Sequence, residues 1–312
     1  MAADAKYRKK VTPRPRRSHA QPLSDEELLT KLRSLGVEID RPGLERLSEQ
    51  ALSAEEIARR LLEQRVFKSQ REELESDWIW IGLATLWQRW FPDRAGIELL
   101  DDKMQLGYDL LASSGSVAAC RIWLEAWNDV LRLFNKSGLK SIQEFDDRFR
   151  VTQSLFNWIQ DLEQELWNAG LGDRQFLTAR IAVVEEALRR FPSDDALMIE
   201  NCRRAWAESY FELGEADKAE ALYQDWLKAD PGWGWRWIGW SDRYGFTRTE
   251  RQDLKRCEQI LREGLSIAGV RDRADMAERL ADLLEEQGRH EEAAEFWREA
   301  EAAAPHQRDH SG

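Results

Sequence analysis

The chain has 312 residues, of which 42% are hydrophobic and 33% charged, and its 46 Lys and Arg against 58 Asp and Glu give a net charge of -12. Fifteen Trp and eleven Phe supply apolar surface that needs burial, which excludes a chain that is disordered throughout. The length predicts roughly two folding units, or one elongated array, in a soluble acidic protein.

The first segment, 1–22, is basic and has no apolar periodicity. Residues 1–20 carry a net charge of +6, which leaves -18 for the rest of the chain. We predict a disordered arm that ends near Pro22. Its basic residues could contact nucleic acid, and they are Arg8, Lys9, Lys10, Arg14, Arg16 and Arg17. The alternatives are a solvated tail and an arm that occupies the protein's own acidic surface.

The next segment, 23–75, predicts a module of three short helices. A capping box that starts at Ser24 predicts a helix over 25–35, and Asp40 and Ser53 stand where two further helices would begin. A helix-turn-helix DNA reader could have this size, but we find no basic recognition face. We therefore expect a structural cap at the N-terminal end of the fold.

Residues 77–91 are apolar on almost every face, and Pro92 follows them. In a soluble protein this pattern predicts a helix that other helices surround. A Trp-lined cofactor site is the alternative. The stretch is shorter than the ~20 residues that span a bilayer, and the first twenty residues lack the apolar core of an export signal. Cys120, Cys202 and Cys257 have neither disulfide nor metal-site spacing, so we expect a cytoplasmic protein without a membrane span.

The segment 200–307 has a period near 34 residues, the spacing of the tetratricopeptide repeat, whose units are pairs of antiparallel helices. Two units carry its pattern of a large-small pair, an aromatic residue, a turn glycine, a small residue, a second aromatic residue and a closing proline, with Leu284 at the first aromatic position of the second unit. The pattern residues are Trp206, Ala207, Tyr210, Gly214, Ala219, Tyr223 and Pro231 in the first unit, and Leu280, Ala281, Leu284, Gly288, Ala293, Trp297 and Pro305 in the second. The last residues, 308–312, should form a frayed tail.

Degenerate copies extend the pattern, with a longer turn in 234–270 and weaker matches within 76–199. One of these weaker copies has Arg180 where the pattern calls for a small residue. Cys120 and Cys257 occupy the small position of their units, so we expect them to be buried packing residues. Altogether the sequence predicts an all-α solenoid of about five helix pairs, preceded by the helical cap.

Two stretches resemble more than a generic repeat: 107–130 contains Gly-Tyr-Asp-Leu-Leu and Ala-Cys-Arg-Ile-Trp-Leu-Glu-Ala-Trp, and 232–244 contains Gly-Trp-Gly-Trp-Arg-Trp-Ile-Gly-Trp-Ser-Asp. They resemble a group of bacterial tetratricopeptide proteins, many of which end in a cysteine-rich zinc-binding SEC-C motif. The resemblance covers roughly 75–305 and implies a protein-binding scaffold. The last residues of this sequence contain no Cys, so the zinc motif is not carried over.

The residue pattern offers little sign of catalysis. The four His do not cluster, and no Gly-rich phosphate loop, G-x-S-x-G or H-E-x-x-H motif is present. Pairs of adjacent acids are common, as expected by chance in a chain with 58 of them. We expect a non-enzyme without cofactor or metal; a hydrolase with an unrecognised site is the remote alternative.

In tetratricopeptide arrays the first helix of each unit lines a concave groove. Transferring that register predicts a groove formed by Asn201, Arg204, Glu208, Glu212, Trp235, Ile238, Asp242, Asp275, Glu278 and Asp282. Such a groove would be acidic with an aromatic floor, suited to a basic or extended segment of another protein. Trp237 and Trp240 should be core, whereas Trp233 and Trp235 could be exposed.

We therefore predict non-catalytic protein recognition, as an adaptor, scaffold or sequestering regulator. The alternative is a nucleic-acid-associated regulator that uses the basic arm, and its binding would weaken steeply with salt.

Overall fold

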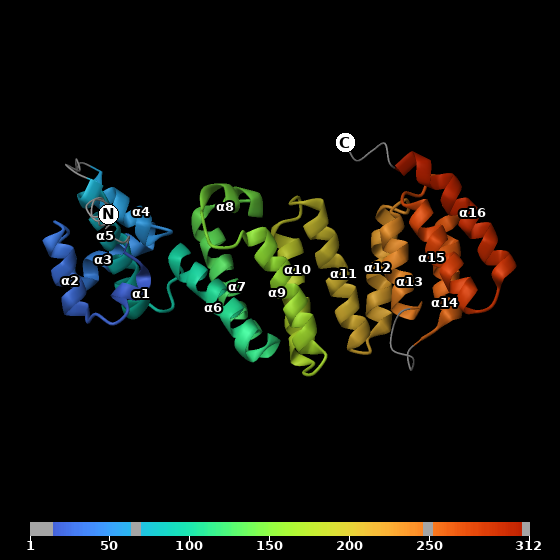
Figure 1. The fold of residues 1–312 in the computed structure, drawn as a ribbon, viewed down its shortest axis with the longest axis horizontal. Helices are drawn as coiled ribbons and strands as arrows, with labels where there is room; N and C mark the ends of the chain where they lie inside the picture. Colours follow the sequence, from blue (N-terminus) through green and yellow to red (C-terminus); the bar gives the residue numbers. More distant parts are fainter. Residues whose placement is uncertain (1–14, 64–69, 246–251, 308–312) are drawn as a thin grey trace, which may run out of the picture. The chain divides into compact units, whose positions relative to one another are not determined.

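The computed structural model describes residues 15–63, 70–245 and 252–307 (Figure 1). Within these ranges the chain forms sixteen α-helices and no strand, which confirms the all-α class. The chain divides into two compact units, Met1–Glu165 and Leu166–Gly312. No helix among the described residues has both the length and the apolar character that a membrane crossing requires.

The first unit contains α1 (Arg17–Ala20), α2 (Asp25–Ser34), α3 (Arg41–Gln50), α4 (Ala54–Leu62), α5 (Gln70–Trp90), α6 (Ile97–Ser114), α7 (Ser116–Ser137), α8 (Ile142–Arg148) and the start of α9 (Leu155–Gly170). The second unit contains the end of α9 followed by α10 (Gln175–Arg190), α11 (Ala196–Glu212), α12 (Ala216–Ala229), α13 (Gly234–Gly245), α14 (Leu254–Leu265), α15 (Arg273–Glu286) and α16 (His290–Gln307).

The three helices predicted at the N-terminal end begin at the residues that the capping signals indicate. The Ser24 hydroxyl accepts a hydrogen bond from the Glu27 backbone N–H (3.2 Å), and the Glu27 carboxylate accepts one from the Ser24 N–H (2.7 Å). Asp40 and Ser53 each accept from a backbone N–H three residues further on, at 2.7 and 2.9 Å. These side chains satisfy N–H groups that have no partner within the helix.

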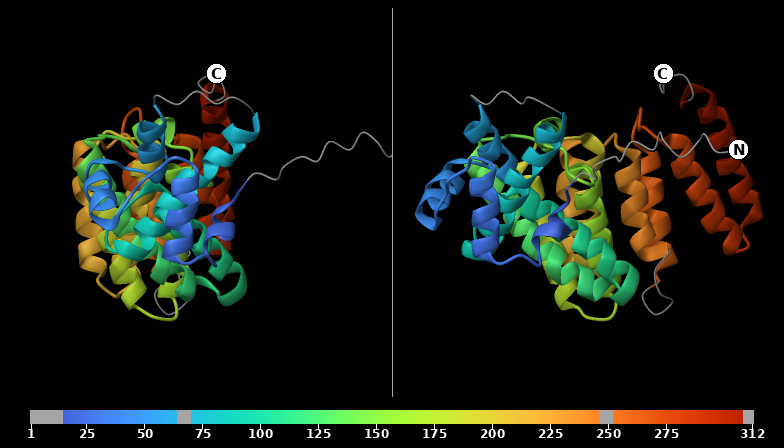
Figure 2. Two further views of the ribbon diagram at one scale, coloured as in Figure 1. Left: turned by 90° about the vertical axis from the view of Figure 1, so that its left-hand side faces the viewer. Right: turned by 60° about the vertical axis from the view of Figure 1, so that its left-hand side comes forward.

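The Trp-rich helix α5 is the core of the N-terminal module, as its apolar pattern predicts. Ile79, Ile81, Leu83, Leu86 and Trp87 are buried, and α5 packs on α1, α2, α3 and α4. In Figures 1 and 2 the blue helices α2 to α4 lie beside α5. Helix α5, which the predicted boundary at 75/76 divides, completes the hydrophobic core of the module.

The predicted arm also ends too late. Helix α1 forms where disorder was expected, with Ala20 fully buried in the core of the module. Arg17 forms an ion pair with Asp102 (2.9 Å) and donates a hydrogen bond to Gln88 (3.1 Å). These long-range contacts hold a four-residue helix that local sequence could not reveal. Arg16 is exposed, and the other basic residues of the predicted arm, Arg8, Lys9, Lys10 and Arg14, lie outside the described residues.

Several helices pack mainly on a neighbour in the chain, as in the pairs α6 with α7, α10 with α11, α13 with α14 and α15 with α16. Figure 1 and the right-hand view of Figure 2 show α15 and α16 side by side in opposite directions. The predicted turn glycines Gly214 and Gly288 have φ values of 78° and 73°, a left-handed conformation that favours glycine.

The small positions of the predicted units are buried. Cys120, Cys257 and Ala293 are completely inaccessible and Ala219 is 1% exposed, so the prediction of packing cysteines is confirmed. Burial raises the pKa of both Cys120 and Cys257 to about 12, which keeps their thiols protonated and unreactive. One terminus differs from the prediction: α16 runs to Gln307 and does not end at the closing proline.

Candidate binding pocket

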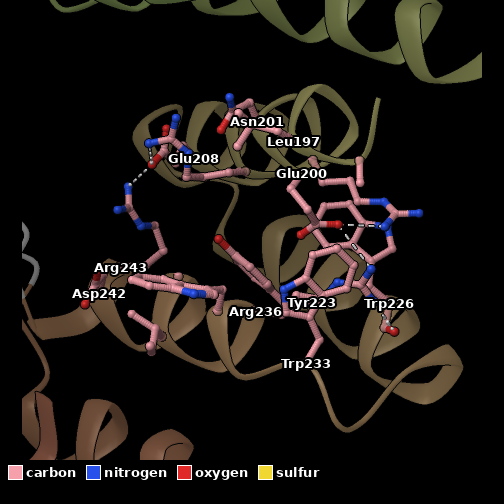
Figure 3. Close-up of a pocket in the computed structure, with 16 residues that line it drawn as sticks. Leu197, Glu200, Asn201, Glu208, Tyr223, Trp226, Trp233, Arg236, Asp242 and Arg243 are labelled. Carbon is pink, nitrogen blue, oxygen red and sulfur yellow. Dashed lines mark hydrogen bonds and ion pairs between the residues drawn. The ribbon is translucent and has the colours of Figure 1, made fainter. Parts of the chain in front are cut away.

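A cavity of about 590 Å³ lies among α11, α12, α13 and the turn that precedes α13 (Figure 3). Six of the ten predicted groove residues line it, and they are Asn201, Arg204, Glu208, Trp235, Ile238 and Asp242. The cavity is within the range of roughly 300–1,000 Å³ that is usual for ligand pockets. The repeat register therefore brings a majority of the predicted residues to one place.

The other four predicted residues do not line this pocket. Glu212 is half-buried at the end of α11, and Asp275, Glu278 and Asp282 lie on α15. Helix α15 packs on α13, α14 and α16 and buries its apolar face there. The pocket therefore contains the part of the predicted groove that lies on α11 and α13, and the predicted residues on α15 lie outside it.

Glu208 differs most from its predicted role as an exposed acid. It is 7% exposed, and its carboxylate pairs with Arg180 of α10 (3.2 Å) and Arg243 of α13 (3.2 Å). Arg180 is 2% exposed and also donates to the Ala205 carbonyl and the Ser209 hydroxyl, each at 3.2 Å. The residue that departs from the repeat pattern is therefore an interior cation with a matching acid on the next helix.

A second cluster forms the opposite end of the pocket. The buried Arg236 of α13 donates to the Trp226 carbonyl (2.8 Å) and pairs with Glu200 of α11 (3.2 Å). Its guanidinium stacks over the Trp233 ring at 4.3 Å, and Arg203 lies over the Trp226 ring at 6.0 Å. These cation-π contacts fix two tryptophans in the wall.

The lining of the pocket is not acidic and carries a small excess of positive charge. Four arginines and three carboxylates line it; the arginines are Arg203, Arg204, Arg236 and Arg243, and the carboxylates are Glu200, Glu208 and Asp242. Every one of these carboxylates pairs with at least one arginine, and Asp242 does so with Arg279 at 3.3 Å. The pocket therefore lacks the acidic character expected for the groove, because arginines from its own and neighbouring helices pair with its carboxylates.

The tryptophans divide as the sequence suggests. Trp237 and Trp240 are core, at 8% and 4% exposure, whereas Trp235 is 53% exposed at the rim of the pocket. Leu197 of α11 is 59% exposed and also lines the pocket. Large apolar side chains that remain this open beside a cavity are typical of an interaction site.

Tyr223 of α12 is a pocket residue that the sequence did not single out, because the repeat pattern uses it as a packing position. Its ring stacks on Trp240 with centroids 5.9 Å apart, and only 3% of the residue is exposed. Its hydroxyl has no hydrogen-bond partner among the described residues, and Figure 3 shows it directed into the space between α11 and α13. Burial raises the pKa of Tyr223, so the hydroxyl stays protonated.

Three further polar atoms of the lining are buried without a hydrogen-bond partner in the described part of the chain. They are the Nε atoms of Arg236 and Arg243 and Oδ1 of Asp242. A buried unpaired polar group costs about 1–3 kcal/mol. With the Tyr223 hydroxyl, these atoms give the pocket four polar groups that a ligand could pair with.

The described residues contain no group of three or more His, Cys, Asp or Glu side chains placed to hold a metal ion. No protein-family model matches the chain, and no curated protein matches it either. The resemblance to tetratricopeptide proteins therefore rests on the residue pattern alone, and the function has to be inferred from the geometry of the pocket.

Proposed function

We propose that this chain is a non-catalytic recognition protein, built as a tetratricopeptide-like solenoid of the bacterial type that its sequence resembles, and that it binds a segment of another protein in the pocket among α11, α12 and α13. One observation carries the proposal. The pocket joins an open apolar rim, Leu197 and Trp235, to a buried floor where the Tyr223 hydroxyl has no hydrogen-bond partner in the described part of the chain. The rim can hold an apolar anchor while the floor recognises a polar group.

The packing of the helices supports the repeat architecture. Turn glycines at 214 and 288 and buried small residues at 219 and 293 recur at the same positions of two helix pairs, α11–α12 and α15–α16, 74 residues apart. Repeat units of this kind bury their apolar faces only against neighbours and leave one face of the array for binding. The free, buried cysteines suit a reducing cytoplasm.

The ion pairs support recognition rather than catalysis. Glu208 has an arginine on each carboxylate oxygen, and Oε1 of Glu200 is held by two arginines, all within 3.2 Å, which fixes the position of both side chains. A general base must instead present an oxygen to the substrate. These carboxylates orient the wall of the pocket.

Site-specific cross-linking tests the proposal. We replace Trp235 by a photo-reactive phenylalanine analogue, irradiate the protein in its native cells and identify adducts by mass spectrometry. The proposal predicts a discrete protein adduct at position 235, lost when Leu197→Glu is added. Leu197 is 59% exposed, so this change leaves the fold intact.

The same analogue at position 278 is the matched control, because Glu278 is exposed but lies outside the pocket. Adducts of equal yield at both positions, or an adduct at 235 that survives Leu197→Glu, would show that the pocket is not the binding site.

A further inference from the structure

The charge around the pocket indicates what kind of group it accepts. Its lining has one more arginine than carboxylates, and the interior Arg180, which does not line the cavity, adds another guanidinium to the cluster around Glu208. The chain as a whole has a net charge of -12. A local positive excess in an acidic protein favours an anionic group at this one place.

The unpartnered atoms point to the same chemistry. Three of them are donors, the Tyr223 hydroxyl and the Nε–H groups of Arg236 and Arg243, whereas the Asp242 oxygen is the one acceptor among the four. A ligand that satisfies them must supply mainly oxygen acceptors. A carboxylate does this with charge-assisted hydrogen bonds, which are roughly twice as strong as neutral ones.

The aromatic walls disfavour a cationic ligand. The Trp233 ring already carries the Arg236 guanidinium at 4.3 Å and that of Arg271 at 5.5 Å, and the Trp226 ring faces Arg203 at 6.0 Å. An incoming Lys or Arg would compete with these arginines for the same ring faces and meet their positive charge. The basic partner expected from the sequence does not suit this pocket.

The rim indicates that the anion belongs to a longer chain. Leu197 and Trp235 are more than half exposed, so they can cover an apolar group from one side only. A side chain that projects from a peptide lying on the surface needs this kind of cover, whereas a free small molecule is usually enclosed to 70–90% or more.

We propose that the pocket binds a peptide segment in which an Asp or Glu side chain adjoins a large apolar one, the acid directed to Arg243 and the Tyr223 hydroxyl and the apolar group to Leu197 and Trp235. This inference rests on the proposed function and names the chemistry of its ligand. Arg204, half-exposed with its guanidinium 4.0 Å from Glu208, stands at the entrance to the charged end.

A peptide library tests the proposal on the full-length protein. The probes are fluorescein-labelled octapeptides with amidated C-termini. Their two central residues are varied over all twenty amino acids, and the flanking residues are Gly and Ser. Fluorescence anisotropy gives each affinity. We expect the tightest peptides to combine Asp or Glu with Leu, Phe or Trp, and their Gln counterparts to bind at least about tenfold more weakly, since a charge-assisted hydrogen bond contributes about 1.5–3 kcal/mol.

Two variants with the same change of charge test whether the preference for acidic peptides arises in the pocket. Arg204→Glu should abolish the preference for acidic peptides, whereas Arg298→Glu on the exposed side of α16 should preserve it. A preference for basic or uncharged peptides, or an acidic preference that survives Arg204→Glu, overturns the ligand chemistry but leaves peptide recognition standing. No binding by any peptide overturns both. Tight binding of free 3-phenylpropionate, equal to that of the best peptide, would assign the pocket to small acids instead.

Discussion

Arg180 and Glu208 form a buried ion pair at a position where the repeat pattern calls for a small residue. Both side chains are almost completely removed from water and lie on adjacent helices, α10 and α11. Desolvation of two charges is costly, so the pair persists only because Arg180 also donates to Ala205 and Ser209 and because Arg243 shares the carboxylate.

Removal of the acid should cost far more than removal of this one arginine. Glu208→Leu leaves Arg180 and Arg243 without their shared carboxylate and should destabilise the protein by about 3–5 kcal/mol. Arg180→Met leaves Glu208 paired with Arg243 and should cost less, and the double variant should be less destabilised than the sum of the two. Urea denaturation measures all three; additive effects would contradict the coupling.

Asp242 provides a pH test. Burial raises its pKa above the ordinary value of 3.8, while Arg279 opposes the shift. The folded state therefore binds a proton more tightly than the unfolded state, and this contribution to stability is present below the unfolded pKa and lost as the pH rises through the folded pKa. Asp242→Asn cannot ionise, so wild type should lose stability relative to this variant as the pH rises from about 4. A constant difference in urea denaturation from pH 4 to pH 8 would refute the raised pKa.

The sequence predicted where the pocket residues lie better than it predicted which charged side chains surround them. The repeat register placed six residues around one pocket, because helical periodicity determines which side chains share a face. It could not predict that Arg180 and Arg279 from other helices would neutralise Glu208 and Asp242, since these ion pairs join residues 28 and 37 positions apart. Only the packing of helices brings them together.

Helices approach closely where side chains are absent, and Gly107 of α6 is the clearest case. A Cβ atom there would lie 1.8 Å from Nε1 of Trp123 on α7, the atom that donates to the Met104 carbonyl. Gly107→Ala should therefore destabilise the protein, even though Ala is the better helix former by about 1 kcal/mol.

Gly239→Ala is the matched control in α13. The nearest atom to its Cβ would be the Tyr223 hydroxyl at 3.6 Å, an ordinary contact. This variant should gain about 0.5–1 kcal/mol from helix propensity alone. Thermal melts of the two variants should shift in opposite directions, and shifts of the same sign would show that the α6–α7 contact is not as close as described.

The small positions of α16 give a second test between helices. Ala293 is fully buried against its neighbours, whereas the next residue, Ala294, is exposed. Ala293→Trp should overpack the contact and cost at least the ~1–3 kcal/mol typical of added core volume, and Ala294→Trp should be nearly neutral. Equal melting temperatures of the two variants would show that the face of α16 with Ala293 is not the buried one.

Elements with strong local signals were predictable, and short ones were not. Capping residues set the starts of α2, α3 and α4, and glycines set the turns of the repeat-like pairs. The helices α1 and α8 have four and seven residues, too few for a periodic pattern, and neither was predicted. The closing proline of the last repeat did not end α16, because a pattern position does not by itself determine a helix end.

The whole chain divides into two compact units, and the boundary between them does not coincide with the boundaries of the predicted repeats. The chain divides after Glu165, within α9, whereas the sequence placed its boundaries at 75/76 and 199/200. The boundaries predicted from the sequence separate segments that match the repeat pattern to different degrees. Compact units depend on long-range packing, as in the burial of α5 among the N-terminal helices.

The most direct test of the central claim, recognition of a peptide through the pocket, is calorimetric titration of the tightest library peptide into two double variants. Leu197→Ala with Trp235→Ala removes the apolar rim, and Leu106→Ala with Leu171→Ala removes two leucines that are 45% and 46% exposed elsewhere. Loss of a binding hot spot costs about 2 kcal/mol or more, roughly 30-fold in Kd. The rim variant should lose at least that much affinity while the control keeps wild-type affinity; equal Kd values for both would contradict the claim.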